Sequence, residues 1–448
     1  MKASKMKRHS LLRKNFSLIL VTLLALLVTA CDDDITPTFT SSAASVKNSS
    51  LAQAANSGIG PANTTLGNPN NIAPPTAIPV AGGDKTGITA TEIKVGSWGP
   101  QSGVAAAYGI EDRVVDAYFK LINAQGGING RKIKFIYEDD QYQAAKTEPL
   151  VRKMVEQDRV FAFVAGLGTA NNLAVKDYLA SKNVPNVAFL TGAGALTNPP
   201  QLNAFAQPPT YTFEATLLAR YAAEQLGAKR VAVLYQNDSF GKEGQQAFSK
   251  TVKEKNLELV AEVPYEEGAT DLAASALKLQ QSGADTVFVE AVSGPALAVL
   301  KEMDKLQYKP KVLLSYVLFD AGFFQAAGKA AEGAYISSYF PLPDGSDPKA
   351  VQFRDFMTRN LPNEPIGVFA ETGYLATQIF VEGLKRAGRD LSRESFVTGL
   401  ESIVDWRGSL SPNITYGSHN RAPQNTLLLY QYKDSKFTRL TDLLPAKP

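Results

Sequence analysis

The feature that most constrains the fold is a regular alternation of two patterns that begins at Glu92. Short runs rich in β-branched and aromatic residues alternate with segments whose apolar residues recur at helical spacing. The predicted strands are 93–95, 133–137, 161–164, 184–189, 231–235, 257–263, 286–290 and 312–315. The predicted helices are 102–124, 144–157, 171–181, 213–226, 240–255, 272–282 and 295–306. This alternation predicts an α/β fold with mainly parallel sheets and helices on both faces.

The alternation comes in two runs, which are separated by Pro208-Pro209. Two runs predict two lobes, each with its own sheet. The tail has a different pattern: we expect helices at 350–359, 369–387 and 393–400. A hairpin of 427–430 and 437–440 follows them, turning at Lys433-Asp434.

The first 30 residues have the pattern of a secretory signal peptide. Six Lys and Arg residues and no acid precede or flank an apolar run from Phe16 to Val28. That run is too short to span a bilayer, which needs about 20 apolar residues. It ends in Val28-Thr29-Ala30-Cys31, which is similar to the bacterial lipobox, and Cys31 is the single cysteine of the chain. We therefore expect residues 1–30 to be cleaved and Cys31 to carry the lipid, which anchors the protein on the outer face of the cytoplasmic membrane. The alternative is an incidental free cysteine.

Residues 31–85 are predicted to be the lipidated cysteine and a disordered tether. The segment is dominated by Ser, Thr, Asn, Ala, Pro and Gly, which bury too little apolar surface to order a chain.

The net charge limits which partners the protein can bind. The whole chain has 46 basic and 43 acidic residues, and removal of the first 30 leaves 40 and 43. A mature chain that is slightly acidic lacks the excess of basic residues that is typical of nucleic-acid-binding proteins.

A ligand of an open α/β sheet binds at the carboxyl ends of the strands, where helix N-termini present free N–H groups. In the first lobe these places are the loops 97–108, 166–169 and 190–193. In the second lobe they are 236–240, 290–293 and 316–317. The loops combine glycines, small hydroxyl residues and aromatics, and none contains Lys or Arg. We therefore expect hydroxyls and backbone dipoles to hold a ligand carboxylate and aromatic rings to enclose an apolar body.

Several motifs resemble the periplasmic branched-chain amino-acid (Leu/Ile/Val) binding protein family. They are Ile93-Lys-Val-Gly with Tyr108-Gly109, the run 123–133 (NAQGGINGRKI), the run 234–241 (LYQNDSFG), and Gly408 with His419-Asn-Arg. The resemblance covers residues 91–440 in order. It implies a two-lobed type I periplasmic-binding-protein fold with three hinge crossovers, near residues 208, 340 and 410. Lobe 1 would be 86–208 plus 341–409, and lobe 2 would be 209–340 plus 410–448.

Site residues follow from the same resemblance. Tyr108 falls on the family's Tyr-Gly turn, Thr169 on a carboxylate-binding serine, and Leu190-Thr191-Gly192 on the carboxylate loop. In the second lobe Phe240 replaces a tyrosine, and Tyr316 stands where amino-acid binders have the glutamate that pairs with the ligand ammonium. Trp98 is a further expected contact, and Glu290 could supply the missing charge. The 190–193 loop and the 234–238 run are more similar to the branch that binds aromatic acids and other non-amino-acid solutes.

Each site residue also has a structural reading. Trp98 and Tyr108 could simply pack in their loops, Thr169 could cap a helix, and Phe240 could be a core residue. Glu290 could be a solvated strand end, and His419 is expected to be structural.

The expected function is an extracytoplasmic solute-binding lipoprotein of an ABC importer, working with permease and ATPase subunits as a monomer without cofactor or metal. Its ligand would be a small organic carboxylate with an aromatic or apolar body, with an amino acid or amide as the next choice. The alternative is a tethered sensor ectodomain that presents its ligand to a membrane receptor. Catalysis is disfavoured because the chain has only two histidines, no Gly-x-Ser-x-Gly elbow and no phosphate-binding glycine loop.

Overall fold

The computed structural model describes residues 82–445. The signal peptide, Cys31 and the tether up to residue 81 lie outside the described residues. Within the described range, no helix is long and apolar enough to cross a membrane. All the structure that follows belongs to one compact unit of the chain.

The first sheet has five parallel strands in the order β2-β1-β3-β4-β5. These are β1 (Glu92–Gly99), β2 (Lys132–Asp139), β3 (Ala162–Val164), β4 (Asn186–Phe189) and β5 (Ala204–Ala206). The strands β3, β4 and β5 are buried along their whole length, which is typical of a parallel sheet covered on both faces. Because all neighbouring strands of this sheet are parallel, each connection must cross from one end of the sheet to the other instead of forming a hairpin.

The second sheet has eight strands, and β12-β11-β10-β9-β8-β6-β7 is its main order, with β13 paired to β11. The strands from β6 to β10 are parallel: β6 (Arg230–Gln236), β7 (Glu258–Tyr265), β8 (Thr286–Glu290), β9 (Lys311–Leu314) and β10 (Tyr335–Ser338). The C-terminal strands are antiparallel: β11 (Thr426–Lys433), β12 (Lys436–Arg439) and β13 (Leu444–Pro445). The fold is therefore α/β with two mainly parallel sheets, as the alternation predicts.

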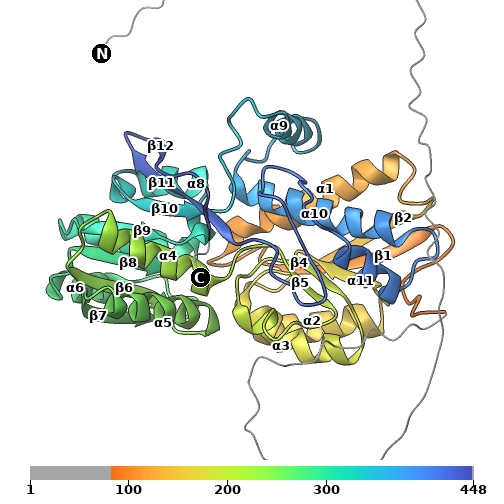
Figure 1. The fold of residues 1–448 in the computed structure, drawn as a ribbon, viewed down its shortest axis with the longest axis horizontal. Helices are drawn as coiled ribbons and strands as arrows, with labels where there is room; N and C mark the ends of the chain where they lie inside the picture. The colour runs from red at the N-terminus through yellow and green to blue at the C-terminus, as the bar shows by residue number, and fades with distance from the viewer. Residues whose placement is uncertain (1–81, 446–448) are drawn as a thin grey trace, which may run out of the picture. The chain divides into compact units, whose positions relative to one another are not determined.

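Helices connect the strands and cover the sheets (Figure 1). On the first sheet they are α1 (Ile110–Ala124), α2 (Ala144–Glu156), α3 (Thr169–Ser181), α9 (Pro348–Asn360), α10 (Val368–Ala387) and α11 (Arg393–Glu401). With the second sheet belong α4 (Tyr211–Glu224), α5 (Ser239–Glu254), α6 (Ala273–Gln281), α7 (Ser293–Lys305) and α8 (Ala321–Ala327). The helix α10, which follows the second sheet's parallel strands in sequence, packs on α1, α11 and β4. We call each sheet with its helices the first and the second lobe.

Two elements differ from their predicted bounds in ways that matter for the site. The helix predicted from residue 102 begins at Ile110, after a 3-10 turn at Ala106–Gly109. The strand predicted to end at Val95 continues to Gly99, because β2 pairs with it over eight residues. The pattern missed β5, β10, α8 and β13, which are short and lack a periodic signal. The hairpin turn lies at Asp434 and Ser435, both with positive φ.

The chain passes between the lobes after β5, after β10 and before β11. The third passage was expected near residue 410, but the following residues still contact the first lobe. The Ala206 N–H of β5 donates to the Arg421 carbonyl at 2.9 Å, and the Tyr416 hydroxyl donates to the Ala206 carbonyl at 2.5 Å. The passage therefore lies between Arg421 and Thr426.

The start of the described chain is fixed to the first lobe. Asp84, within the expected tether, forms an ion pair with Arg393 at the start of α11, at 2.6 Å. Its backbone N–H also donates to Glu394 at 2.9 Å.

Candidate functional site

A cavity of about 60 Å³ lies between the carboxyl ends of the two sheets. Since a water needs roughly 10–15 Å³ on this measure, the cavity has space for about four waters or a small solute. Its described wall combines aromatic, aliphatic and a few polar residues from both lobes. These are Tyr108, Tyr142, Tyr211, Phe240, Tyr316, Tyr339 and Phe369; Leu167, Leu190, Pro208, Val292, Val317 and Val368; and Glu111, Gly168, Thr191 and Thr372.

One part of the cavity is a cluster of hydroxyl groups. The Oγ1 atoms of Thr169 and Thr191 are 2.6 Å apart, and both residues are buried. Thr169 opens α3, and Gly168 before it has a φ of +100°, where a side chain would meet Asn171 at 2.2 Å. Tyr211 opens α4 and joins the cluster: burial raises the pKa of its hydroxyl, and hydrogen bonding to Thr191 partly lowers it. Neutral donors at two helix N-termini can hold a carboxylate.

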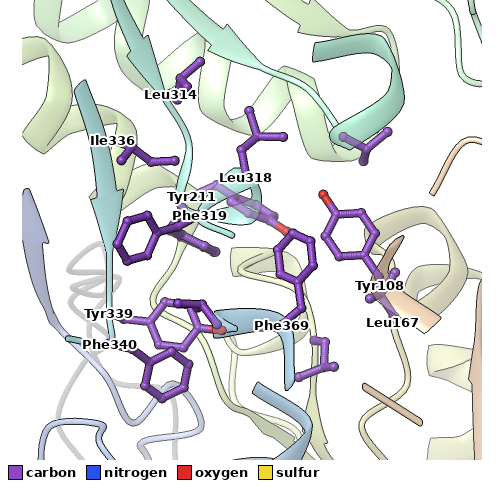
Figure 2. Packing of buried hydrophobic residues seen from close by; sticks show 14 of the residues in the cluster. Tyr108, Leu167, Tyr211, Leu314, Leu318, Phe319, Ile336, Tyr339, Phe340 and Phe369 are labelled. Carbon is purple, nitrogen blue, oxygen red and sulfur yellow. The ribbon is translucent and has the colours of Figure 1, made fainter. Parts of the chain in front are cut away.

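The rest of the wall is largely aromatic. Figure 2 shows the rings of Tyr108, Tyr211, Tyr339 and Phe369 gathered at this place from four different segments. Tyr108 and Phe369 have ring centroids 4.7 Å apart, and Tyr316 contacts both Tyr211 at 5.7 Å and Tyr339 at 5.2 Å. Such a wall favours a flat or apolar ligand body.

The wall carries one ionisable acid and, in its described part, no Lys, Arg or His. The acid is Glu111 in the first turn of α1, and burial raises its pKa well above the usual range. No group of three His, Cys, Asp or Glu residues within 82–445 is placed to hold a metal ion. The described cavity therefore offers hydroxyls, backbone groups and one carboxyl for polar recognition.

The structure brings most of the expected ligand residues together. Tyr108, Leu190, Thr191, Phe240 and Tyr316 are in the wall itself. Thr169 lies directly behind the wall, where its hydroxyl is hydrogen-bonded to that of Thr191, and it is the first residue of α3. It is placed both to start a helix and to support the hydroxyl cluster.

Gly192 lies under the aromatic wall. A Cβ atom at this position would be 2.3 Å from the Tyr316 hydroxyl oxygen and 2.5 Å from the Pro209 carbonyl oxygen. The Gly192 carbonyl accepts the Tyr211 N–H at 3.0 Å, and the Tyr316 hydroxyl donates to the Pro209 carbonyl at 2.9 Å. The close approach of these segments requires a residue without a side chain.

Trp98 is placed elsewhere than expected. It lies on β1, is fully buried and packs edge-on against Phe163 at 5.2 Å, so it belongs to the core and is absent from the cavity wall. The reason is the extension of β1, which turns residues 97–99 from a loop into strand.

Glu290 is also absent from the wall. It is fully buried at the end of β8, its carboxyl lies against Gly244 of α5, and neither oxygen has a partner among the described residues. Burial raises its pKa well above the usual range, and the nearby acids Glu214 and Glu243 add to this. It is neither a solvated strand end nor a cavity residue.

Sequence reasoning missed Glu111, Tyr142, Tyr211, Tyr339 and Phe369. Tyr211 had a usable signal, because it follows Pro208-Pro209-Thr210 and starts a helix that Thr210 caps. Tyr339 follows β10, which carried no clear strand pattern, and Phe369 comes from the tail of the chain.

Direct contacts join the two lobes beside the cavity. The Tyr108 hydroxyl donates to the Val317 carbonyl at 2.8 Å. The Gly194 N–H donates to both carboxylate oxygens of Glu243, at 3.1 and 3.0 Å. Beside the cavity, donors of the first lobe thus meet acceptors of the second lobe.

Comparison with known proteins gives a consistent result. The family model described as periplasmic binding protein matches residues 92–436. The Leu/Ile/Val-binding protein homolog 7 of Brucella abortus is 21% identical over 364 residues, covering 77% of this chain and 90% of the relative. The Leu/Ile/Val-binding protein BraC3 of Rhizobium johnstonii is 23% identical, with 77% and 93% covered.

Solved structures share the fold. A fatty acid ABC transporter substrate-binding protein from Thermomonospora curvata has a TM-score of 0.75 at 18% identity, covering 81% of this chain and 95% of its own. A branched-chain amino acid ABC transporter protein from Thermus thermophilus, with bound valine, has a TM-score of 0.73 at 20% identity, with 80% and 97% covered. A solute-binding protein from R. palustris in complex with benzoate has a TM-score of 0.71 at 21% identity, with 80% and 97% covered.

Proposed function

Because the chain belongs to the periplasmic binding protein family, a family of ABC-transporter solute-binding proteins, we propose that it binds a small organic carboxylate and delivers it to an importer. The observation that carries this proposal is the cavity, in which a hydroxyl cluster adjoins an aromatic wall. The ligand carboxylate accepts hydrogen bonds from Thr191, supported by Thr169, and from the helix N-termini. The aromatic rings then cover an apolar or aromatic body.

The mechanism is binding by closure of the two lobes. The first lobe takes the carboxylate on the hydroxyl cluster, and rotation about the three passages brings Phe240 and Tyr316 over the ligand. The bonds from Tyr108 to Val317 and from Gly194 to Glu243 support this, because they join the lobes beside the cavity. The closed surface is what a permease would recognise.

The cavity favours a non-amino-acid carboxylate, and an amino acid or amide is the next candidate. Tyr316 takes the place expected for an ammonium partner, but it carries no negative charge, and its hydroxyl proton is donated to the Pro209 carbonyl. Phe240 contributes a ring without a polar atom. A buried ammonium without an acid is costly, so an amino-acid ligand would have to pair with Glu111, the one carboxyl of the described wall.

We further propose that the protein acts as a lipid-anchored monomer on the outer face of the cytoplasmic membrane. The support is the sequence alone: a signal-peptide pattern, a lipobox-like end and the single Cys31. The region 31–81 then serves as a tether for the lobes.

A thermal-shift screen of the full-length chain tests the proposed ligand class. The panel contains benzoate and related aromatic acids, aliphatic acids, branched-chain amino acids and short amides. A ligand at about 100 times its Kd stabilises the folded state by roughly 2.7 kcal/mol, a shift of several degrees. We expect carboxylates to give the largest shifts. A panel in which no solute shifts the transition contradicts the proposal.

A further inference from the structure

Glu111 is an acid in the cavity wall that the carboxylate-binding role does not use. It is the second residue of α1, and its side chain is 5% exposed. Its Oε2 atom is buried and has no hydrogen-bond partner among residues 82–445. A buried carboxyl oxygen without a partner costs free energy, so its presence in a ligand cavity needs a reason.

The neighbouring acids differ from Glu111 because they have partners. Asp112 accepts hydrogen bonds from Ser97 Oγ at 2.7 Å and from Gln101 Nε2 at 3.1 Å. Asp320, from the second lobe, accepts from the Gly322 N–H at 2.8 Å. These acids are tied into the protein, whereas Glu111 is left facing the cavity.

The cation nearest to Glu111 in sequence is already engaged. Arg113 forms a two-point contact with Glu364, at 2.6 and 3.2 Å, and a further hydrogen bond to Gln101 at 3.1 Å. No Lys, Arg or His stands in the part of the wall that the structure describes. The protein therefore supplies no charged partner to Glu111 from the cavity side.

The two polar features of the cavity are complementary in chemistry. The hydroxyl cluster of Thr169, Thr191 and Tyr211 can donate hydrogen bonds to an acceptor. Glu111 is the one carboxyl of the described wall, and its carboxyl oxygen can accept a hydrogen bond in either protonation state. Burial raises its pKa, and the charges of Asp112 and Asp320 raise it further, so a neutral carboxyl is favoured until a cation arrives.

We propose that Glu111 receives a hydrogen-bond donor of the ligand, so that the solute carries an O–H or N–H group in addition to its carboxylate. This inference rests on the proposed function and narrows its ligand class. A hydroxyl donor would meet the neutral carboxyl. An ammonium donor would ionise it, and the carboxyl proton would pass to the solvent buffer.

The test uses two pairs of probes that differ by the donor alone. They are 4-hydroxybenzoate with benzoate, and valine with 3-methylbutanoate. Isothermal titration of the full-length protein gives Kd for each probe with the wild type, Glu111→Leu and Glu111→Gln. Glu148→Gln is the control, because Glu148 is a half-exposed acid of α2 that lies outside the cavity wall and pairs with Arg152 at 2.9 Å. Thermal denaturation without ligand checks that each variant folds.

We expect the wild type to bind the donor-bearing member of one pair at least tenfold more tightly. Glu111→Leu should abolish that preference and leave the donor-free member within about threefold. Glu111→Gln separates the donor types, because it keeps the preference for a hydroxyl and loses it for an ammonium. Titration in two buffers of different ionisation enthalpy shows the released proton in the ammonium case.

A wild type that binds benzoate or 3-methylbutanoate but prefers the donor-bearing member in neither pair overturns the assignment of Glu111 alone. A preference that persists in Glu111→Leu overturns it too, and so does a loss equal for both members of a pair. If Glu111→Leu does not fold, the probe preferences of the wild type and of Glu111→Gln decide whether Glu111 receives the donor. If none of the four probes binds, the assignment fails together with the proposed ligand class.

Discussion

The contact between Glu243 and Gly194 allows lobe closure to be tested without changing a residue of the cavity wall. Glu243 lies on α5 of the second lobe, outside the cavity wall, and accepts the Gly194 N–H of the first lobe at 3.1 and 3.0 Å. Its other partner, the Thr212 hydroxyl at 3.0 Å, belongs to its own lobe and is kept when the lobes part. In the proposed closure, replacing Glu243 by Ala therefore removes the contact that joins the two lobes here, while the Thr212 contact is lost equally from both forms.

The expected magnitude follows from that single bond. A hydrogen bond to a charged group is worth about 1.5–3 kcal/mol, and partial exposure of Glu243 reduces this to roughly 1–1.5 kcal/mol. Since 1.4 kcal/mol is a factor of ten, Glu243→Ala should weaken Kd by about five- to tenfold. Glu243→Gln keeps an acceptor without the charge, and we expect about a twofold effect.

Isothermal titration with the tightest-binding solute of the panel measures these changes. Glu254→Ala is the matched control, because Glu254 is on the same helix, exposed, and only loosely paired with Lys250 at 3.8 Å. The control should bind like the wild type. A Glu243→Ala protein that binds within twofold of wild type would refute the role of this contact in closure.

Three further predictions concern other parts of the chain. Gly192→Ala places a Cβ against the Tyr316 hydroxyl and should destabilise the protein by about 1–3 kcal/mol in urea unfolding, whereas Gly345→Ala, whose Cβ would have its nearest neighbour, Asp347 N, at 4.0 Å, should not. Burial raises the pKa of Glu371 to about 8, so the neutral carboxyl contributes most to stability in acid, and this contribution is lost as the pH rises through 8. Between pH 6 and 9, Glu371→Gln should therefore lose less of its free energy of unfolding than the wild type does. Cys31→Ser should move the protein from the membrane to the soluble fraction, and an unchanged distribution would contradict the anchor.

Local sequence patterns predicted most of the helices and strands, because hydrophobic periodicity depends only on residues that are close together in the chain. The alternation from Glu92 predicted the parallel sheets and placed Tyr108, Thr191, Phe240 and Tyr316 in the loops after the strands, and the family resemblance implied that the two lobes would bring them together. These four residues line one cavity in the structure. Short strands such as β5 and β10 were not predicted, because three or four residues show too little periodicity to be distinguished from a loop.

Only the tertiary structure decided which residues with similar sequence contexts face the cavity. Trp98 and Tyr108 were both expected to contact the ligand, but pairing with β2 extends β1 and buries Trp98 in the core. Glu290 and Glu111 are both buried acids, yet packing against α5 turns Glu290 away while the first turn of α1 brings Glu111 to the wall. The sequence by itself determined the fold class and the chemistry available at the strand ends. The choice among those residues depended on strand pairing and helix packing, which join segments far apart in the chain.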